Sequence, residues 1–241
     1  MMLFRQLFDI ESSTYTYLVA DPKNKEAALI DPVLEQVERD YKLLKELGLN
    51  LKYCLETHIH ADHITGTGEL RKLSGCQGIV PINAQAQCAD RQIRDGEIIT
   101  VGEIEIKAIE TLGHTDSHMA YLVNDDLEEI RFVGRVLTGD AVFIGGCGRT
   151  DFQGGDPGLL YDSVTQKLFT LAEETLVYPG HDYRGHTVST IGQEKRFNPR
   201  FAGHDRASFT RLMNNLNLPN PQKMMEALPA NKGCGEFAVS R

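Results

Sequence analysis

The chain has 241 residues, of which 41% are hydrophobic and 24% charged, and its formal net charge is −9 at pH 7. This length fits one large domain that buries its own core without disulfides. The acidic balance argues against the broad basic surface that nucleic acid requires, and no stretch approaches the roughly 18–20 apolar residues that span a bilayer. The composition therefore indicates a globular protein with neither a nucleic-acid nor a membrane partner.

Strand and helix signals alternate along the first third of the chain. Runs of β-branched, aromatic or aliphatic residues, separated by turn formers, predict strands at 3–8, 14–20 and 26–30. Asp31 and Pro32 then predict a helix start, as the N-cap and the first helical residue. Apolar residues at helical spacing continue this helix to Gly48, and 51–57 is a further predicted strand.

The alternation continues through most of the remaining chain. We expect helices at 66–74 and 157–171, a hairpin at 97–112, and strands at 78–82, 119–124, 131–138 and 175–178. Strands interleaved with helices indicate a layered α/β architecture. We expect a single domain over residues 1–241, in which about 187–241 is a short helical C-terminal extension.

The N-terminal segment and the cysteines bear on the compartment. The N-terminal segment lacks the basic and apolar regions of a signal peptide and the arginine-rich pattern of a transit peptide. We therefore expect a cytoplasmic bacterial protein, or the mature part of a mitochondrial matrix protein. The cysteines are widely separated and odd in number, so we expect reduced thiols rather than a disulfide framework. They are Cys54, Cys76, Cys88, Cys147 and Cys234.

The segment from Thr57 to His63 carries the most specific chemistry. His58, His60, Asp62 and His63 lie within six residues, directly after a predicted strand. Imidazole and carboxylate groups are ligands that Zn²⁺ and Fe²⁺ favour in proteins. A polar loop with solvated histidines is the weaker alternative. The segment therefore predicts a metal site.

Three later residues follow predicted strands in the same way, each directly after a glycine. Ligands delivered from several strand ends to one sheet edge are how α/β folds build sites. Taken alone, each of these residues has a simple structural explanation, but together with the cluster they predict further metal-binding positions. They are His114, Asp140 and His181.

The full set, HxHxDH followed by a histidine, an aspartate and a histidine, resembles the metallo-β-lactamase superfamily. The resemblance covers roughly residues 1–186 and implies an α/β sandwich, the four-layer αβ/βα fold, with metals at the sheet edges. The GD at 139–140 and the GCGR at 146–149 are similar to the glyoxalase II branch, whose members use glutathione thioesters. The RTDFQ at 149–153 and the YPGHDY at 178–183 resemble the persulfide dioxygenases, also called sulfur dioxygenases.

Similarity to persulfide dioxygenases implies one Fe²⁺ per chain, held by His58, His114 and Asp140. This facial arrangement of two histidines and one carboxylate leaves positions for O₂ and a substrate sulfur. The implied reaction consumes glutathione persulfide, O₂ and water and forms glutathione and sulfite. The remaining residues of the set then orient the ligands and line the pocket. These are His60, Asp62, His63 and His181. Asp182 follows His181 directly, and we expect it to orient His181 or Tyr183.

The resemblance also implies substrate contacts and bears on partners. Arg149 and Tyr183 match positions that contact the glutathione portion in relatives, whereas we interpret His118 and Cys147 as structural. Residues 1–241 contain no rhodanese-like pattern, so we expect any sulfurtransferase partner to be a separate chain. The sequence leaves the oligomeric state open, a homodimer included.

By spacing alone, the same residues complete a dinuclear zinc site. The main alternative is therefore a hydroxyacylglutathione hydrolase of the glyoxalase II type. That family has an aromatic-Glu-Gly sequence after the CGR element and a longer helical C-terminal domain, and this chain differs in both. A catalytically silent binding module is an alternative of another class, although every candidate ligand is present. A lactamase proper lacks the GCGR element.

Overall fold

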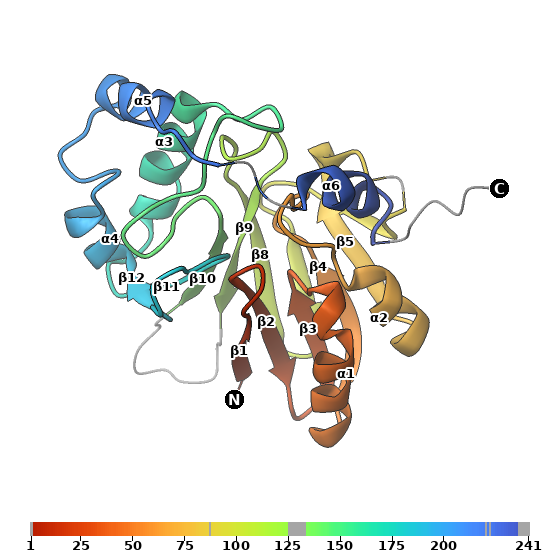
Figure 1. Cartoon of the computed structure of the whole chain (residues 1–241). Coiled ribbons are helices and arrows are strands. Elements are labelled where there is room, and N and C mark those ends of the chain that lie inside the picture. The colour runs from red at the N-terminus through yellow and green to blue at the C-terminus, as the bar shows by residue number, and fades with distance from the viewer. Residues whose placement is uncertain (1, 87, 125–133, 220, 222, 236–241) are drawn as a thin grey trace. The chain divides into compact units, whose positions relative to one another are not determined.

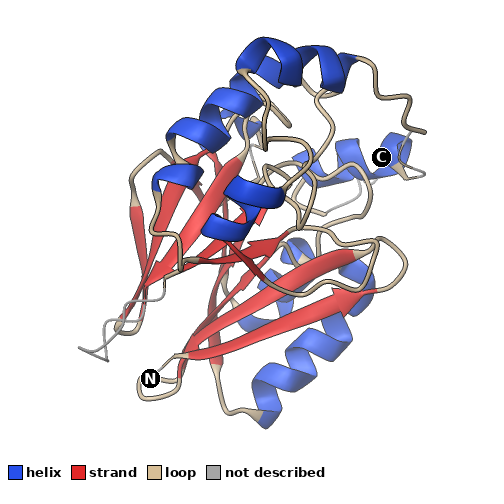
Figure 2. Ribbon diagram, turned by 90° about the vertical axis from the view of Figure 1, so that its left-hand side faces the viewer, coloured by secondary structure: helices blue, strands red, loops and turns tan. Residues whose placement is uncertain are grey.

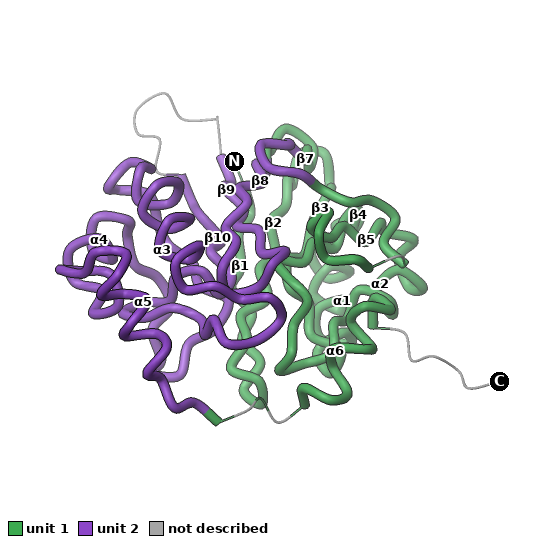
Figure 3. The backbone as a smooth tube through the Cα atoms, turned by 90° about the horizontal axis from the view of Figure 1, so that it is seen from above, with its two compact units in different colours: residues 1–93, 99–105, 219–241 green, residues 94–98, 106–218 purple. Residues whose placement is uncertain are grey.

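The computed structural model describes residues 2–86, 88–124, 134–219, 221 and 223–235 (Figure 1). The chain divides into two compact units, one formed by residues 1–93, 99–105 and 219–241, the other by 94–98 and 106–218 (Figure 3). The strands form two six-stranded sheets, and helices lie against the strands (Figure 2). This confirms the predicted α/β architecture. None of the helices in the described ranges is long and apolar enough to cross a membrane.

The first sheet is antiparallel at its beginning and parallel from its third strand onward. The order is β1 (Leu3–Asp9), β2 (Thr14–Asp21), β3 (Glu26–Ile30), β4 (Asn50–Leu55), β5 (Gln77–Pro81) and β6 (Arg91–Ile93). β3, β4 and β5 pair in parallel, so their carboxyl ends meet at one edge of the sheet. Five of these strands were predicted, whereas the short β6 was not.

Helices α1 (Val37–Glu46) and α2 (Thr67–Ser74) lie side by side next to β4 and β5 (Figure 1). Leu44 of α1 and Leu70 of α2 are buried in one cluster with Leu29 and Cys54 of the sheet. Burying one such aliphatic side chain stabilises the fold by about 1.5–3 kcal/mol. This packing fixes the sheet edge from which the loop with the histidine cluster leaves.

The predicted N-cap role of Asp31 is wrong. The helical region begins with a 3₁₀ turn at Leu34–Gln36, and Val33 occupies its N-cap position. Asp31 adopts a left-handed backbone conformation with φ of 51°. Its N–H donates to the carbonyl of Leu55 at 2.9 Å, and its buried carboxylate accepts bonds from the loop after β4 instead of capping a helix.

The second sheet has the order β12 (Ser189–Thr190), β11 (Leu176–Pro179), β10 (Arg135–Gly139), β9 (Met119–Asn124), β8 (Ile104–Glu110) and β7 (Ile98–Val101). β10 and β11 are parallel, so Asp140 and His181 leave the sheet at the same edge. The predicted hairpin corresponds to β7 and β8. Of the strand predicted at 131–138, residues 131–133 lie outside the described residues.

The helices of the second unit are α3 (Pro157–Gln166), α4 (Ile191–Phe197) and α5 (Arg206–Asn214). Asp156 caps α3 by accepting the N–H of Leu159 at 2.8 Å, and Pro157 takes the first helical position. The predicted helix at 157–171 is too long, because α3 ends at Gln166 and a separate 3₁₀ turn follows at Leu168–Thr170.

The predicted C-terminal extension divides between the two units, and its last helix, α6 (Met224–Lys232), belongs to the first unit. Ala227 and Ala230 of α6 are buried against Ile64. Two residues beyond α6, Cys234 forms a disulfide with Cys88. The expectation of reduced thiols was wrong for this pair, because a sequence separation of 146 residues hides a pairing that only the fold creates.

We expect loss of this disulfide to destabilise the first unit. Cys234→Ser should lower the free energy of unfolding by about 2–5 kcal/mol, because the crosslink restricts the unfolded chain. Chemical denaturation of the non-reduced protein measures this difference. Dithiothreitol should bring the wild-type protein to the stability of the variant and leave the variant unchanged. A wild-type curve that does not respond to the reductant contradicts the pairing.

Candidate metal centre

The loop between β4 and α2 carries the histidine cluster of the first unit. His58, His60 and His63 are all buried, with exposures of 2%, 1% and 0%. The ring centroids are 4.1 Å apart for His58 and His60, and 4.4 Å apart for His60 and His63. Ligand atoms of His60, Asp62 and His63 all lie within 4.8 Å of one another. This burial excludes the alternative of a solvated polar loop.

Hydrogen bonds fix which nitrogen of His58 carries the lone pair. The Thr57 hydroxyl donates its proton to Asp31 Oδ2 at 2.8 Å. Since a hydroxyl has one proton, it must accept at its 2.9 Å contact with His58 Nδ1. His58 Nδ1 is therefore protonated and Nε2 carries the lone pair, which is the form that a metal binds.

Asp31 orients His60 in a related way. The two are joined by a 3.0 Å bond between His60 Nε2 and Asp31 Oδ1. Burial alone lowers the pKa of His60, but the Asp31 carboxylate, together with Glu56 and Asp62, outweighs this effect, so the pKa lies well above its usual value. Asp31 therefore both fixes the ring and raises its basicity, as carboxylates beside metal-binding histidines do. No pattern in the sequence indicated this role, beyond the position of Asp31 at a strand end.

The ring nitrogens of His60 and His63 bear on whether this loop binds a metal ion. Within the described part of the chain, His60 Nδ1 and His63 Nε2 are buried without a hydrogen-bond partner. The other nitrogen of His63, Nδ1, bonds to Asp62 Oδ2 at 2.9 Å. An unpaired buried polar atom is costly. A metal ion is a partner that satisfies a buried imidazole lone pair.

In the second unit, His114 and Asp140 come together. The N–H at His114 Nδ1 donates to the carbonyl of Arg149 at 2.7 Å, so Nε2 carries the lone pair. His114 Nε2 lies 3.5 Å from Asp140 Oδ2. Two ligand atoms on one ion at common coordination angles are roughly 3.0–3.4 Å apart, given metal–ligand distances of about 2.1 Å. The observed separation is close to that spacing.

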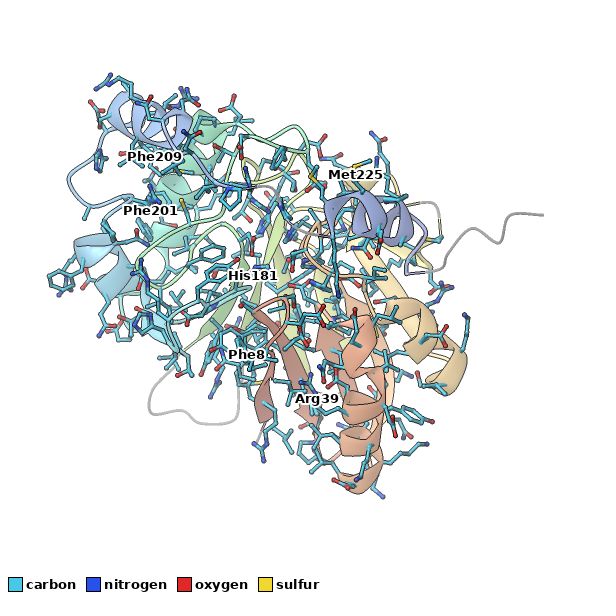
Figure 4. The ribbon with its side chains drawn as sticks, in the orientation of Figure 1. Phe8, Arg39, His181, Phe201, Phe209 and Met225 are labelled. Carbon is cyan, nitrogen blue, oxygen red and sulfur yellow. A yellow bond between two sulfur atoms is a disulfide. The ribbon has the colours of Figure 1, made fainter. Side chains whose placement is uncertain are left out.

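Two further histidines hold Asp140 in place. His181 Nδ1 bonds to Asp140 Oδ1 at 2.7 Å, and His181 lies inside the molecule (Figure 4). His118 Nε2 accepts the backbone N–H of Asp140 at 3.0 Å, while its Nδ1 bonds to the Thr111 hydroxyl at 2.8 Å. His118, interpreted as structural from the sequence, thus positions the carboxylate. The position of His118 in the sequence did not indicate that it contacts Asp140.

The glycines beside these residues permit close approach. A Cβ at Gly148 would lie 2.7 Å from His114 Nδ1 and 2.6 Å from the carbonyl oxygen of Asp140. Gly113 has a φ of 126°, and a Cβ there would lie 2.2 Å from the backbone nitrogen of Leu160. A side chain at either position would displace the His114–Asp140 pair or the chain that carries it.

The predicted substrate contacts lie in the second unit. Arg149 is already engaged by Asp151, with bonds of 2.7 and 2.8 Å, and its guanidinium lies 4.1 Å from the centre of the Phe152 ring. Tyr183 is 71% exposed, and its ring is parallel to that of His181. The Asp182 carboxylate accepts the N–H groups of Arg184 and His186, so it shapes the turn that follows Tyr183.

Comparisons with known proteins show the family of this chain. Residues 10–181 match the family model of the Metallo-beta-lactamase superfamily. The chain is 48% identical to the mitochondrial persulfide dioxygenase ETHE1 of Mus musculus, over 97% of this chain and 89% of the relative. A crystal structure of ETHE1 from Myxococcus xanthus superposes with a TM-score of 0.91 at 50% identity, covering 98% of this chain and 100% of the other. This chain belongs to the persulfide dioxygenase family.

Membership of the persulfide dioxygenase family confirms the resemblance on which the predicted fold rests. The chain has the metallo-β-lactamase fold and its α/β class. A hydroxyacylglutathione hydrolase of Dictyostelium discoideum is more distant, at 31% identity over 72% of this chain and 64% of that protein. Together, the family and the buried histidine and aspartate groups establish that this persulfide dioxygenase has a metal centre.

Cys147 lies in the GCGR element of this persulfide dioxygenase. Its Sγ is 3.8 Å from Met213 Sδ, and burial raises the pKa of the thiol to about 12. Near neutral pH this thiol is therefore protonated. Since the thiolate is the reactive form, Cys147 is chemically inert under these conditions.

We expect iodoacetamide to leave Cys147 of the native protein unmodified between pH 7 and pH 9. Because its pKa is raised, the thiolate appears only as the pH approaches about 12. Peptide mapping by mass spectrometry measures the modification, and unfolded protein serves as the control in which Cys147 reacts. A labelling rate with a midpoint near the ordinary thiol pKa of about 8.5 contradicts the prediction.

Proposed function

We propose that this persulfide dioxygenase oxidises glutathione persulfide on one ferrous ion per chain. The observation that carries the proposal is its similarity, over nearly the whole chain, to proteins named persulfide dioxygenase. The reaction is glutathione persulfide + O₂ + H₂O → glutathione + sulfite + 2 H⁺. The two sulfurs together lose the four electrons that O₂ takes up, so no further reductant is needed.

We assign the iron to His58, His114 and Asp140. The tautomers support this assignment, because hydrogen bonds to Thr57 and to the Arg149 carbonyl place the lone pairs on Nε2 of both histidines. Asp140 Oδ1 accepts the bond from His181. We therefore assign the metal-ligand role to Oδ2, which lies 3.5 Å from His114 Nε2. Ferrous iron in a site of two histidines and one carboxylate supplies electron transfer between a sulfur substrate and O₂.

The chain's own residues prepare this site in two ways. Buried carboxylates and hydroxyls hold the imidazoles in one orientation, so little reorganisation is required when substrate binds. Burial of the three loop histidines also keeps bulk water from that part of the site.

The contacts to the glutathione portion are further proposals. Arg149 offers a guanidinium of the type that pairs with a substrate carboxylate, although Asp151 now holds two of its N–H groups. Tyr183 supports the same role through its exposure beside His181. For the compartment, the mouse and human relatives are named mitochondrial. We propose the mitochondrial matrix or, for a bacterial source, the cytoplasm.

One observation favours a second candidate, a dinuclear zinc hydroxyacylglutathione hydrolase. The buried His60 Nδ1 and His63 Nε2 have no hydrogen-bond partner among the described residues, and a second ion satisfies such atoms. The Dictyostelium discoideum hydrolase is nevertheless the more distant relative. An assay of both activities on both metal forms separates the two candidates.

We expect the iron-loaded protein to consume O₂ with glutathione persulfide and to release sulfite. The zinc-loaded protein should take up no O₂, because Zn²⁺ has no redox chemistry. An oxygen electrode and a sulfite assay measure the reaction, and S-lactoylglutathione is the control substrate. A flat oxygen trace from the iron form, together with rapid thioester cleavage by the zinc form, contradicts the dioxygenase and supports the hydrolase.

We expect His58→Ala, His114→Ala and Asp140→Ala each to abolish iron retention. His63→Ala and His181→Ala should keep most of the iron, because these residues orient the site without ligating the ion. Elemental analysis of purified variants measures the iron, and His186→Ala, whose side chain is 47% exposed, is the matched control. Loss of iron from His181→Ala as complete as from His114→Ala contradicts a three-ligand site.

A further inference from the structure

Asn231 of helix α6 bonds to the backbone of the loop that carries the histidine cluster. Its Nδ2 donates to the carbonyl oxygens of His60 and His63, at 2.8 Å each. Its Oδ1 accepts the N–H of Thr65 at 2.8 Å. Both amide protons and the amide oxygen are therefore used, and Asn231 is only 3% exposed.

These three bonds are specific to an amide side chain. An aspartate at position 231 keeps the bond to Thr65 but places a second oxygen against the two carbonyls, which are acceptors themselves. An alanine leaves the carbonyls of His60 and His63 and the N–H of Thr65 without this partner. A buried backbone group that is left without a hydrogen-bond partner destabilises the loop.

Several independent contacts hold Asn231 in this position. Ala227 and Ala230 pack against Ile64, in the same loop. Lys223, at the start of α6, pairs with Glu11 and Glu35 at 2.9 and 2.7 Å. After the helix, the disulfide of Cys234 with Cys88 fixes the chain, and a Cβ at Gly235 would lie 2.3 Å from the Thr65 carbonyl oxygen.

We propose that Asn231 is a positioning residue for the metal centre. It fixes the carbonyls of His60 and His63, and thereby the loop that carries the proposed ligand His58 together with these two rings and the Asp62 carboxylate. It acts through the loop and does not touch the metal. The inference rests on the proposed metal site but not on its dioxygenase chemistry, because it concerns metal affinity and geometry.

Cobalt binding tests this inference without reference to catalysis. Co²⁺ titrations of the full chain give both the dissociation constant and a visible absorption spectrum that reports the ligand geometry. Asn231→Asp should raise the dissociation constant about ten- to hundredfold and change the spectrum, as loss of supporting contacts around metal ligands does. Because folding is monitored by circular dichroism at the same temperature, a change in affinity is distinguished from unfolding.

Lys223→Ala is the matched control. It removes ion pairs that hold α6 but leaves all three bonds of Asn231 in place, so it should lower the melting temperature without changing the cobalt affinity or spectrum. Asn231→Ala is the second variant in case Asn231→Asp does not fold. Cobalt binding by a folded Asn231 variant with the wild-type constant and spectrum overturns the inference. An equal loss of affinity in Lys223→Ala also overturns it, because docking of the whole helix would then be the cause.

If the wild-type protein takes up no O₂, the proposed function fails, while the cobalt results still decide the role of Asn231.

Discussion

A buried imidazole has two ring nitrogens, and each needs a partner. In this chain, one ring nitrogen of each of three histidines at the candidate site is bonded to a protein group. Thr57 holds His58, Asp31 holds His60, and the Arg149 carbonyl holds His114. The tautomers follow from these bonds, and with them the direction in which each lone pair points. The remaining features of the site, from the close-packed glycines to the C-terminal helix, serve to keep these orientations.

Asp31 and Asp140, two of the buried aspartates, distribute their hydrogen bonds in different ways. Asp31 is occupied entirely within the protein, since it accepts bonds from Thr57 and His60. Asp140 is held at its N–H by His118 and at Oδ1 by His181, with Oδ2 near His114 Nε2. One aspartate is therefore suited to orienting ligands and the other to being a ligand. Nothing in residue type distinguishes them, and only their hydrogen-bond partners do.

Much of the fold and the chemistry was predictable because its signals are local. Strand periodicity located β1 to β5, and the rule that ligands follow strand ends selected His114, Asp140 and His181. The roles of Asp31 and Asn231, and the pairing of Cys88 with Cys234, were not predictable. Asn231 lies 166 residues from Thr65, and no local pattern indicates that they meet. Asp31 was wrongly predicted as an N-cap, because an Asp-Pro pair after a strand is also typical of a helix start.

We propose that one iron is held by His58, His114 and Asp140. This assignment is tested by crystallography of the iron-loaded protein, with anomalous difference maps recorded on both sides of the iron absorption edge. The proposal predicts a single iron peak bonded to Nε2 of both histidines and to Asp140 Oδ2. Two metal peaks, with the second bonded to His63 Nε2, would contradict it and would support the dinuclear alternative.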